Sequence, residues 1–409
     1  MISCFSRKKA LPLGRILSPA FCLMLAFVFL FANKVAAQDQ QTQSPNQQSQ
    51  PPNQQEAPPA AGGPNDDAGP YAIPKKKEAP PEPPPETPKK IEGLPNYSIN
   101  VSVPEVDIPV LVTTKDGQFI PNLKKGNFKV YEDGVQQNIA NFSESQDAPI
   151  TAVLLVEFAQ TNYAFLEDTL IGAYNFTNNL KKNDWVAVEY YDIKPHIVVD
   201  FTQNKQAVVG ALNQMRMPEW AETNLFDALY DTLDRLQSIQ GHKYIILIST
   251  GIDSFSKLRL DEILKKVKSS QDVTIFPVSI GWAIREYCEV HRCTGQLQVR
   301  GGLPLGQMDY LQADNEMNTY ARLTGGRAYF PRFEAEFPEI FHSILGDIRS
   351  QYTLTYRPSN AKQDGSYRKL KVEVVAPDGS PLKVRDQKGK DVKYQIIAKE
   401  GYTAKRTVE

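Results

Sequence analysis

Three apolar runs decide the fold: Ile150-Thr-Ala-Val-Leu-Leu-Val156, Tyr244-Ile-Ile-Leu-Ile-Ser249 and Val273-Thr-Ile-Phe-Pro-Val-Ser-Ile280. Each run is apolar at nearly every position, which is typical of a strand buried on both faces of a parallel sheet. Apolar residues at helical spacing predict the intervening helices. The region therefore predicts an α/β fold with a doubly wound, mostly parallel sheet. The predicted helices span 165–180, 204–214, 224–239, 258–269, 309–324 and 336–350.

Two further strands are predicted inside this region, at Trp185–Tyr191 and His196–Phe201. The short turn between them predicts an antiparallel hairpin. After the third apolar run we expect a long loop over 282–308, and later a short strand at Arg327–Phe330. The α/β domain is assigned to residues 149–350.

Alternating strands flank this domain on both sides, in 94–148 and 351–409. Asp-Gly pairs between them favour tight turns. Because neither flank alone has many strands, we hypothesise that the two pack together as one β-sandwich interrupted by the α/β domain. The predicted flanking strands are Tyr97–Val103, Val110–Thr113, Phe128–Tyr131, Tyr352–Tyr356, Leu370–Val375 and Tyr394–Ala398.

The N-terminus has the pattern of an export signal. A basic start precedes an uninterrupted apolar core, Ala20–Ala32, and Val35-Ala36-Ala37 offers small residues for cleavage. We expect residues 1–37 to be a cleaved signal peptide, with an uncleaved membrane anchor as the alternative. Residues 38–93 are rich in proline and glutamine and predict a disordered linker, either an inert tether or a ligand for a proline-binding module.

Removal of the signal would leave two cysteines, Cys288 and Cys293. In an oxidising compartment such a pair most simply forms a disulfide. His291 between them suggests a metal site, but two thiols and one imidazole fall short of the usual four ligands. The sequence favours the disulfide.

The charge balance excludes several classes of function. The chain has 46 basic and 47 acidic side chains, whereas a nucleic-acid binder needs a strongly basic face. After the N-terminus no apolar run is long enough to span a membrane, so no integral membrane body is predicted. The motifs of metalloproteases, serine hydrolases and phosphate-binding loops are absent from the sequence. We expect a protein that is not an enzyme.

Specific segments resemble a von Willebrand factor type A domain. They are Thr223-Asn-Leu-Phe-Asp-Ala-Leu229, Ile246-Leu-Ile-Ser-Thr-Gly251 with Asp253, and Leu323-Thr-Gly-Gly-Arg-Ala-Tyr-Phe330. Upstream, Asn127-Phe-Lys-Val-Tyr-Glu-Asp-Gly134 is similar to the exported VWFA-related proteins of acidobacteria. The resemblance covers about three quarters of the chain, residues 97–402.

The resemblance implies a place for one divalent cation, magnesium or calcium, held by oxygen ligands. This metal-ion-dependent adhesion site is degenerate here. Ala159 and Thr250 stand where ligands are expected, and Glu157 replaces an aspartate. Thr161 and Thr223 keep hydroxyls at two positions. Asp253 is a possible substitute acid; alternatively, it is a solvated loop residue or caps the helix near 258. The weak metal candidates are Glu157, Thr161, Thr223 and Asp253, and we expect no cofactor.

The loops at the carboxyl ends of parallel strands share one face. Trp220, Trp282, Arg285 and Tyr287 lie in these loops, and aromatic residues and arginine are typical interface anchors. They are candidates for binding a protein partner; packing of the loops onto the domain explains them equally well.

Four functions remain. The leading hypothesis is an exported, non-catalytic protein-interaction module, periplasmic or secreted, that acts without metal. The alternatives are a cation-dependent adhesion module, a structural envelope scaffold and an enzyme. The sequence identifies neither the partner nor the oligomeric state.

Overall fold

The computed structural model describes residues 105–145, 148–215, 217–291, 305–385 and 389–406. They all lie within the compact unit Pro95–Glu409. The predicted signal peptide, the whole of the predicted linker 38–93 and the strand at Tyr97–Val103 lie outside the described residues, as does Cys293. Among the described helices, none combines the length and apolar character needed to cross a membrane.

The predicted α/β sheet is confirmed. Its strands are ordered β7-β6-β5-β8-β9. Neighbouring strands pair in parallel except β6 and β7, which form the expected antiparallel hairpin. The strands are β5 (Thr151–Glu157), β6 (Trp185–Tyr191), β7 (Pro195–Thr202), β8 (Lys243–Ser249) and β9 (Val273–Ser279).

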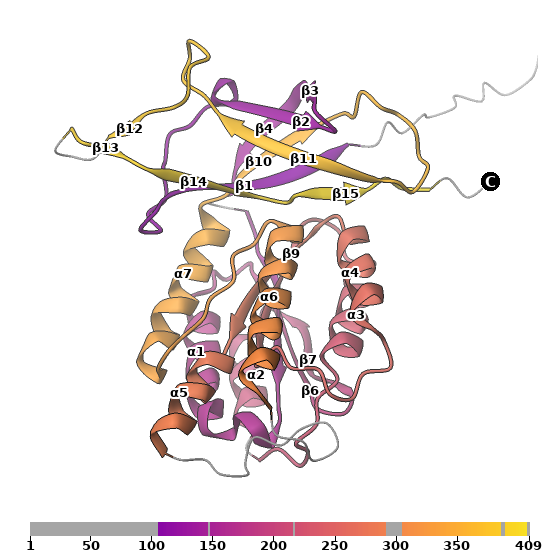
Figure 1. Ribbon diagram of the computed structural model, residues 1–409, viewed down its shortest axis with the longest axis vertical. Helices are drawn as coiled ribbons and strands as arrows, with labels where there is room; N and C mark the ends of the chain where they lie inside the picture. The colour runs from indigo at the N-terminus through magenta and orange to yellow at the C-terminus, as the bar shows by residue number, and fades with distance from the viewer. Residues whose placement is uncertain (1–104, 146–147, 216, 292–304, 386–388, 407–409) are drawn as a thin grey trace, which may run out of the picture. The chain divides into compact units, whose positions relative to one another are not determined.

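The central strand β5 shows why its sequence is apolar from Ala152 to Val156. Leu154 and Val156 lie in one buried cluster, and Val153 and Leu155 lie in another on the opposite face of the sheet. Helices cover both faces (Figure 1). The helices of the first face are α1 (Leu166–Asn179), α2 (Lys205–Leu212), α5 (Gly281–His291) and α7 (Phe337–Arg349); those of the second are α3 (Leu225–Leu236), α4 (Leu260–Ser269) and α6 (Gln307–Thr324).

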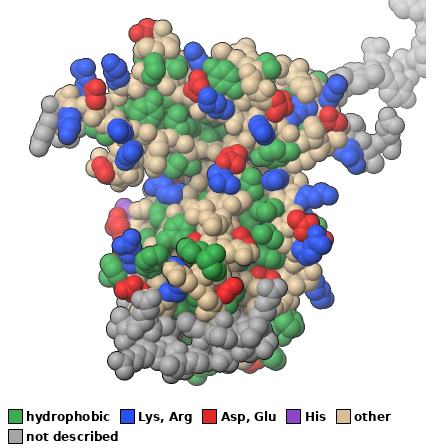
Figure 2. All heavy atoms as spheres, in the orientation of Figure 1, with side chains coloured by type: hydrophobic (Ala, Val, Ile, Leu, Met, Phe, Trp, Pro, Cys, Tyr) green, Lys and Arg blue, Asp and Glu red, His purple; other side chains and the backbone are tan. Residues whose placement is uncertain are grey.

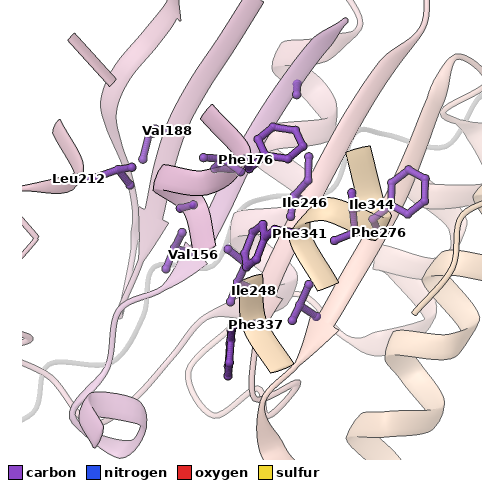
Figure 3. Close-up of a cluster of buried hydrophobic side chains, with 14 of the residues drawn as sticks. Val156, Phe176, Val188, Leu212, Ile246, Ile248, Phe276, Phe337, Phe341 and Ile344 are labelled. Atoms are coloured by element: carbon purple, nitrogen blue, oxygen red, sulfur yellow. The ribbon is translucent and has the colours of Figure 1, made fainter. Parts of the chain in front are cut away.

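Figure 3 shows part of the first cluster, in which side chains of α1, α2 and α7 meet those of the sheet. Helices α1 and α7 approach each other closely at Gly172. A Cβ atom at that position would lie 2.2 Å from the ring of Phe341, so only glycine permits this packing. Both rings of this contact region, Phe176 and Phe341, are fully buried.

The hypothesis of a single β-sandwich built from both flanks is confirmed. One sheet has the order β14-β1-β10-β4 and the other β15-β11-β2-β3, with one shared apolar cluster between them. Strands before the α/β domain pair with strands after it, β1 with β10 and β2 with β11. The strands are β1 (Val106–Thr114), β2 (Phe128–Glu132), β3 (Val135–Gln137), β4 (Ile139–Glu144), β10 (Tyr352–Tyr356), β11 (Tyr367–Val374), β14 (Tyr394–Ala398) and β15 (Gly401–Thr403), with a small hairpin of β12 (Val384–Arg385) and β13 (Asp391–Val392).

Asp184 joins the two ends of the inserted α/β region. Its Oδ1 accepts a hydrogen bond of 2.8 Å from the backbone N–H of Ile150, and its carboxylate pairs with Arg349 at the end of α7. Arg349 also donates to the carbonyl of Ala148, 2.6 Å away. These contacts hold together the points where the chain leaves and re-enters the sandwich.

Two sequence expectations were wrong in detail. The segment 282–308 does not begin as a loop, since α5 covers its start, where Ala283 and Ile284 are buried in the core. The expected strand at Arg327–Phe330 is reduced to a single bridge between Val278 and Tyr329. Three short 3-10 helices complete the described chain: Lys125–Asn127, Gln160–Phe165 and Glu334–Glu336.

Candidate functional site: the carboxyl end of the sheet

The parallel strands β5, β8 and β9 end at one edge of the sheet, as strands that pair in parallel must. The segments that leave this edge carry the residues singled out in the sequence. We call them together the carboxyl-end surface, which comprises residues 157–165, 192–195, 213–215, 217–224, 250–259, 280–287 and 305–309.

Glu157 ends β5 and is 1 % exposed. Its carboxylate accepts hydrogen bonds from the backbone N–H of Thr250 at 2.7 Å, from Ser249 Oγ at 2.7 Å and from Thr250 Oγ1 at 2.9 Å. Tyr191 reaches the same group by donating to Ser249 Oγ at 2.7 Å. Burial raises the pKa of Glu157, and the bonds from Ser249 and Thr250 oppose that rise.

Two of the remaining metal candidates, Thr223 and Asp253, also form hydrogen bonds within the protein. Thr223 Oγ1 donates to the carbonyl of Ile252 at 2.8 Å. Asp253 Oδ1 accepts from the backbone N–H of Phe226 at 3.3 Å and from Ser256 Oγ at 2.5 Å. Asp253 therefore caps the first turn of α3, and the suggestion that it caps the helix near 258 was wrong.

Asp227 instead holds the segment just before α4, because its carboxylate accepts hydrogen bonds from the backbone N–H groups of Lys257 and Leu258. Ala159 is fully buried and contributes no ligand atom. Thr161 is partly exposed on the 3-10 helix that follows β5. Among the described residues, no three His, Cys, Asp or Glu side chains gather in a way that could hold a metal ion. The side-chain oxygens of Glu157, Thr223 and Asp253 therefore form hydrogen bonds with other groups of the same chain.

The four candidates for partner binding divide into two groups. Trp220 and Trp282 are exposed, at 45 % and 37 %. Arg285 is largely covered: its guanidinium lies 4.7 Å from the Trp282 ring centroid and 3.5 Å from the carboxylate of Asp314. Tyr287 packs edge-on against Phe165 at 5.8 Å. Arg285 and Tyr287 therefore pack α5 onto the domain.

The predicted disulfide falls outside the described side chains. Cys288 belongs to the backbone of α5, and the placement of its partner, Cys293, is not described.

Sequence reasoning missed a cavity beside the β6–β7 hairpin, lined in part by Phe158, Tyr190, Asp192 and His196. Its signal was present in the sequence as Tyr190-Tyr-Asp192 followed by His196. The sequence of a strand does not indicate which distant segment packs beside it. Here that segment comes from residues 213–215 and 217–220.

The described chain thus contains a doubly wound α/β domain, with its carboxyl-end surface available, inserted in a β-sandwich. No family model matches the chain, and no curated protein matches it. Among solved structures it is similar to a von Willebrand factor type A protein from Catenulispora acidiphila, with 10% identity, a TM-score of 0.39, and coverage of 75% of this chain and 76% of that one.

Two further bacterial structures are similar over about half of this chain. One is the conserved hypothetical protein BatB from Bacteroides thetaiotaomicron, with 12% identity, a TM-score of 0.34, and coverage of 49% of this chain and 100% of that one. The other is the vWF domain of the type V pili tip protein Mfa5 from Porphyromonas gingivalis, with 12% identity, a TM-score of 0.36, and coverage of 49% and 95%.

Proposed function

We propose that this chain is an exported, non-catalytic protein-interaction module whose carboxyl-end surface binds a protein partner without a metal ion. The observation that carries the proposal is a concentration of exposed large apolar side chains on that surface. Such side chains are costly to leave in water, and together they mark sites of protein contact. They are Tyr163, Met217, Trp220, Phe255, Trp282 and Met308, each between 37 % and 75 % exposed.

Binding without metal is proposed because the acidic candidates serve the fold. Glu157 holds β5 to β8 through Thr250 and Ser249, and Asp253 caps α3. A cation would have to displace these donors, and a weakly bound ion gains too little from one carboxylate to do so. The alternative is a cation-dependent adhesion module that uses Glu157, Thr161, Thr223 and Asp253.

Calorimetric titration with magnesium, manganese and calcium separates the two functions. We expect no heat of binding at millimolar metal for the natural chain. The triple variant Glu157→Asp, Ala159→Ser, Thr250→Asp restores the ligand types, and we expect it to bind at least one of these ions. Binding by the natural chain with an affinity that Asp253→Asn abolishes would instead support cation-dependent adhesion.

The non-catalytic proposal rests on the missing enzyme motifs and on the surroundings of one histidine. His196 is paired with Asp192 at 3.0 Å, an arrangement that orients a general base. Among the described residues that line the cavity beside it, none is a serine, threonine or cysteine that could act as a nucleophile. Lys and Arg side chains are interspersed with Asp and Glu on the face shown in Figure 2, which agrees with a protein partner and not with nucleic acid.

Site-specific photocrosslinking in the native envelope tests the proposed surface. A photoreactive residue replaces Trp220 or Trp282 on the carboxyl-end surface. The matched control is Trp185, which is 42 % exposed but begins β6, at the opposite end of the sheet. We expect a heterologous protein attached at 220 and 282 and none at 185. Equal products at all three positions would contradict the proposal, and recovery of only the chain itself would favour the envelope scaffold.

A further inference from the structure

A cavity of about 540 Å³ opens on the carboxyl-end surface between the β6–β7 hairpin and residues 214–220. This volume is in the range of sites that bind small molecules or single anchoring side chains with their neighbours, roughly 300–1,000 Å³. The lining combines aromatic, methionine and acidic side chains: Phe158, Tyr190, Asp192, Ile193, Lys194, His196, Val198, Gln214, Met215, Met217, Glu219 and Trp220.

Three aromatic rings of the lining pack on one another as one cluster. Tyr190 stacks on His196 with ring centroids 4.4 Å apart and planes 17° apart. Phe158 packs against the same tyrosine at 5.0 Å. Trp220 contributes from the other segment and keeps 45 % of its surface exposed, so part of its indole remains accessible. Indole is the aromatic group that attracts cations most strongly.

Two carboxylates complete the cavity. Asp192 is only 8 % exposed; its Oδ1 accepts from the backbone N–H of Lys194 at 3.0 Å and also lies 3.0 Å from Nε2 of His196. Glu219 lies on the opposite segment. Burial raises the pKa of the Tyr190 phenol, and the negative charges of Asp192 and Glu219 raise it further. The same negative charges that disfavour an ionised Tyr190 would attract a cation into the cavity. Lys194 is the one lysine in the lining, and its exposed position leaves its ammonium group in water.

Backbone hydrogen bonds fix this arrangement before any ligand binds. Gln160 donates its backbone N–H to the carbonyl of Trp220 at 2.8 Å and its side-chain amide to the carbonyl of Glu219 at 2.9 Å. Asn224 N–H donates to the carbonyl of Asp192 at 2.8 Å. The segment with Glu219 and Trp220 is therefore tied to the 3-10 helix that follows β5, and the hairpin turn is tied to the start of α3, so little ordering would be needed on binding.

We propose that this cavity binds the guanidinium group of an arginine side chain presented by the protein partner. A planar guanidinium stacks on an aromatic face and still donates in its own plane to carboxylates, which an ammonium group cannot do. Met217, which is 70 % exposed, offers adaptable apolar surface for the methylene stem. The inference rests on the proposed protein-binding function, for which it names the anchoring side chain.

The test uses acetyl-arginine amide as the ligand, followed by the indole N–H signals of the full chain in NMR titrations. Acetyl-citrulline amide has the same shape without the charge, and acetyl-lysine amide has the charge without the plane. We expect saturable shifts at Trp220 with arginine, and at least about tenfold weaker binding of the other two, since hydrogen bonds to charged groups dominate the difference. Equal responses to all three ligands would overturn the proposal.

Variants locate the binding. Glu219→Gln removes an exposed carboxylate of the cavity, and Asp192→Asn removes the buried one. We expect each to weaken arginine binding about tenfold. Glu286→Gln is the matched control, because this glutamate is exposed on α5 and lies outside the lining. Because Asp192 also orders the hairpin turn, Glu219→Gln decides the result if Asp192→Asn fails to fold. Unchanged affinity in Glu219→Gln would place the arginine elsewhere.

The outcome separates this inference from the proposed function. If crosslinking at Trp220 captures a partner but arginine amide does not bind, the protein-binding function stands and the arginine anchor is wrong. If arginine amide binds with the expected sensitivity to Glu219→Gln but no partner is captured at 220 or 282, the cavity stands and the protein-binding function is wrong.

Discussion

Lys399 gives the sharpest test of the energetics in this structure. It lies in the turn between β14 and β15 and is 5 % exposed. Its Nζ lies 3.5 Å from the carbonyl oxygen of Gln271 and 6.0 Å from the ring centroid of Tyr402. Burial lowers the pKa of Lys399 from 10.5 to about 8, with Asp272 and Asp107 opposing the change. At neutral pH the folded state must therefore hold a poorly compensated charge. The difference in pKa corresponds to about 3 kcal/mol of lost stability.

The sign of the pH dependence follows from proton binding. Between pH 8 and 10.5 the folded chain has released the Lys399 proton while the unfolded chain still binds it, so stability rises with pH across this window. Below pH 8 both states are protonated and the penalty is complete. Lys399→Met removes the titrating group, fills similar space and should be more stable than the natural chain at pH 7.

Urea unfolding at pH 7 and pH 10 measures the effect. Relative to Lys399→Met, the natural chain should gain about 2–3 kcal/mol in free energy of unfolding between the two pH values. Other titrating groups are common to both chains and cancel in the difference. Lys393→Met, at an exposed lysine of the same β region, is the control and should parallel the natural chain. Parallel behaviour of Lys399→Met would show that the Lys399 ammonium is well solvated, and would refute the reasoning.

Two further substitution pairs test packing and buried charge. A Cβ at Gly326 would lie 2.0 Å from a backbone oxygen of β9, so Gly326→Ala should lower the melting temperature strongly, while Gly346→Ala, with open space in α7, should raise stability by about 0.5–1 kcal/mol. Arg368 pairs with buried Glu132 at 3.0 Å, and Arg368→Met should cost about 3–5 kcal/mol in urea unfolding because it leaves that carboxylate without its cation. The exposed pair of Arg357 should contribute less than about 1 kcal/mol, so Arg357→Met is its control. Similar losses in both arginine variants would contradict the distinction.

The sequence was sufficient for the α/β sheet because burial on both faces leaves a plain pattern. Every residue of β8 and β9 is buried, and both strands were recognised from their uninterrupted apolar runs. Strands such as β3 and β15, with three residues each, carry too little periodicity to be recognised. The start of α5 was mistaken for a loop because its helical state depends on Ala283 and Ile284 entering a core formed by distant segments.

The position of the candidate site was predictable from the sequence, but the roles of its residues were not. Spacing placed Glu157, Thr223 and Asp253 at one edge of the sheet, where the structure has them. It did not indicate that each of these side chains hydrogen-bonds to other groups of the same chain, because those groups come from other strands and turns. Tyr191, which hydrogen-bonds to Ser249, is an example: the two residues are 58 positions apart and meet only through the order of β6, β5 and β8.

The residues at positions 157 and 250 support one another. The longer side chain of Glu157 reaches the backbone N–H of Thr250, and the hydroxyl of that threonine donates to the same carboxylate. An aspartate at 157 is one methylene shorter and would lose part of this contact, whereas an aspartate at 250 would put a second carboxylate beside a buried first one. Two such charges in one buried site repel, and one of them must take a proton. Thr250→Asp alone should therefore destabilise the fold without creating a cation site. Only the combined substitution of 157, 159 and 250 is expected to bind a divalent cation from solution, which would offset the repulsion between the two carboxylates.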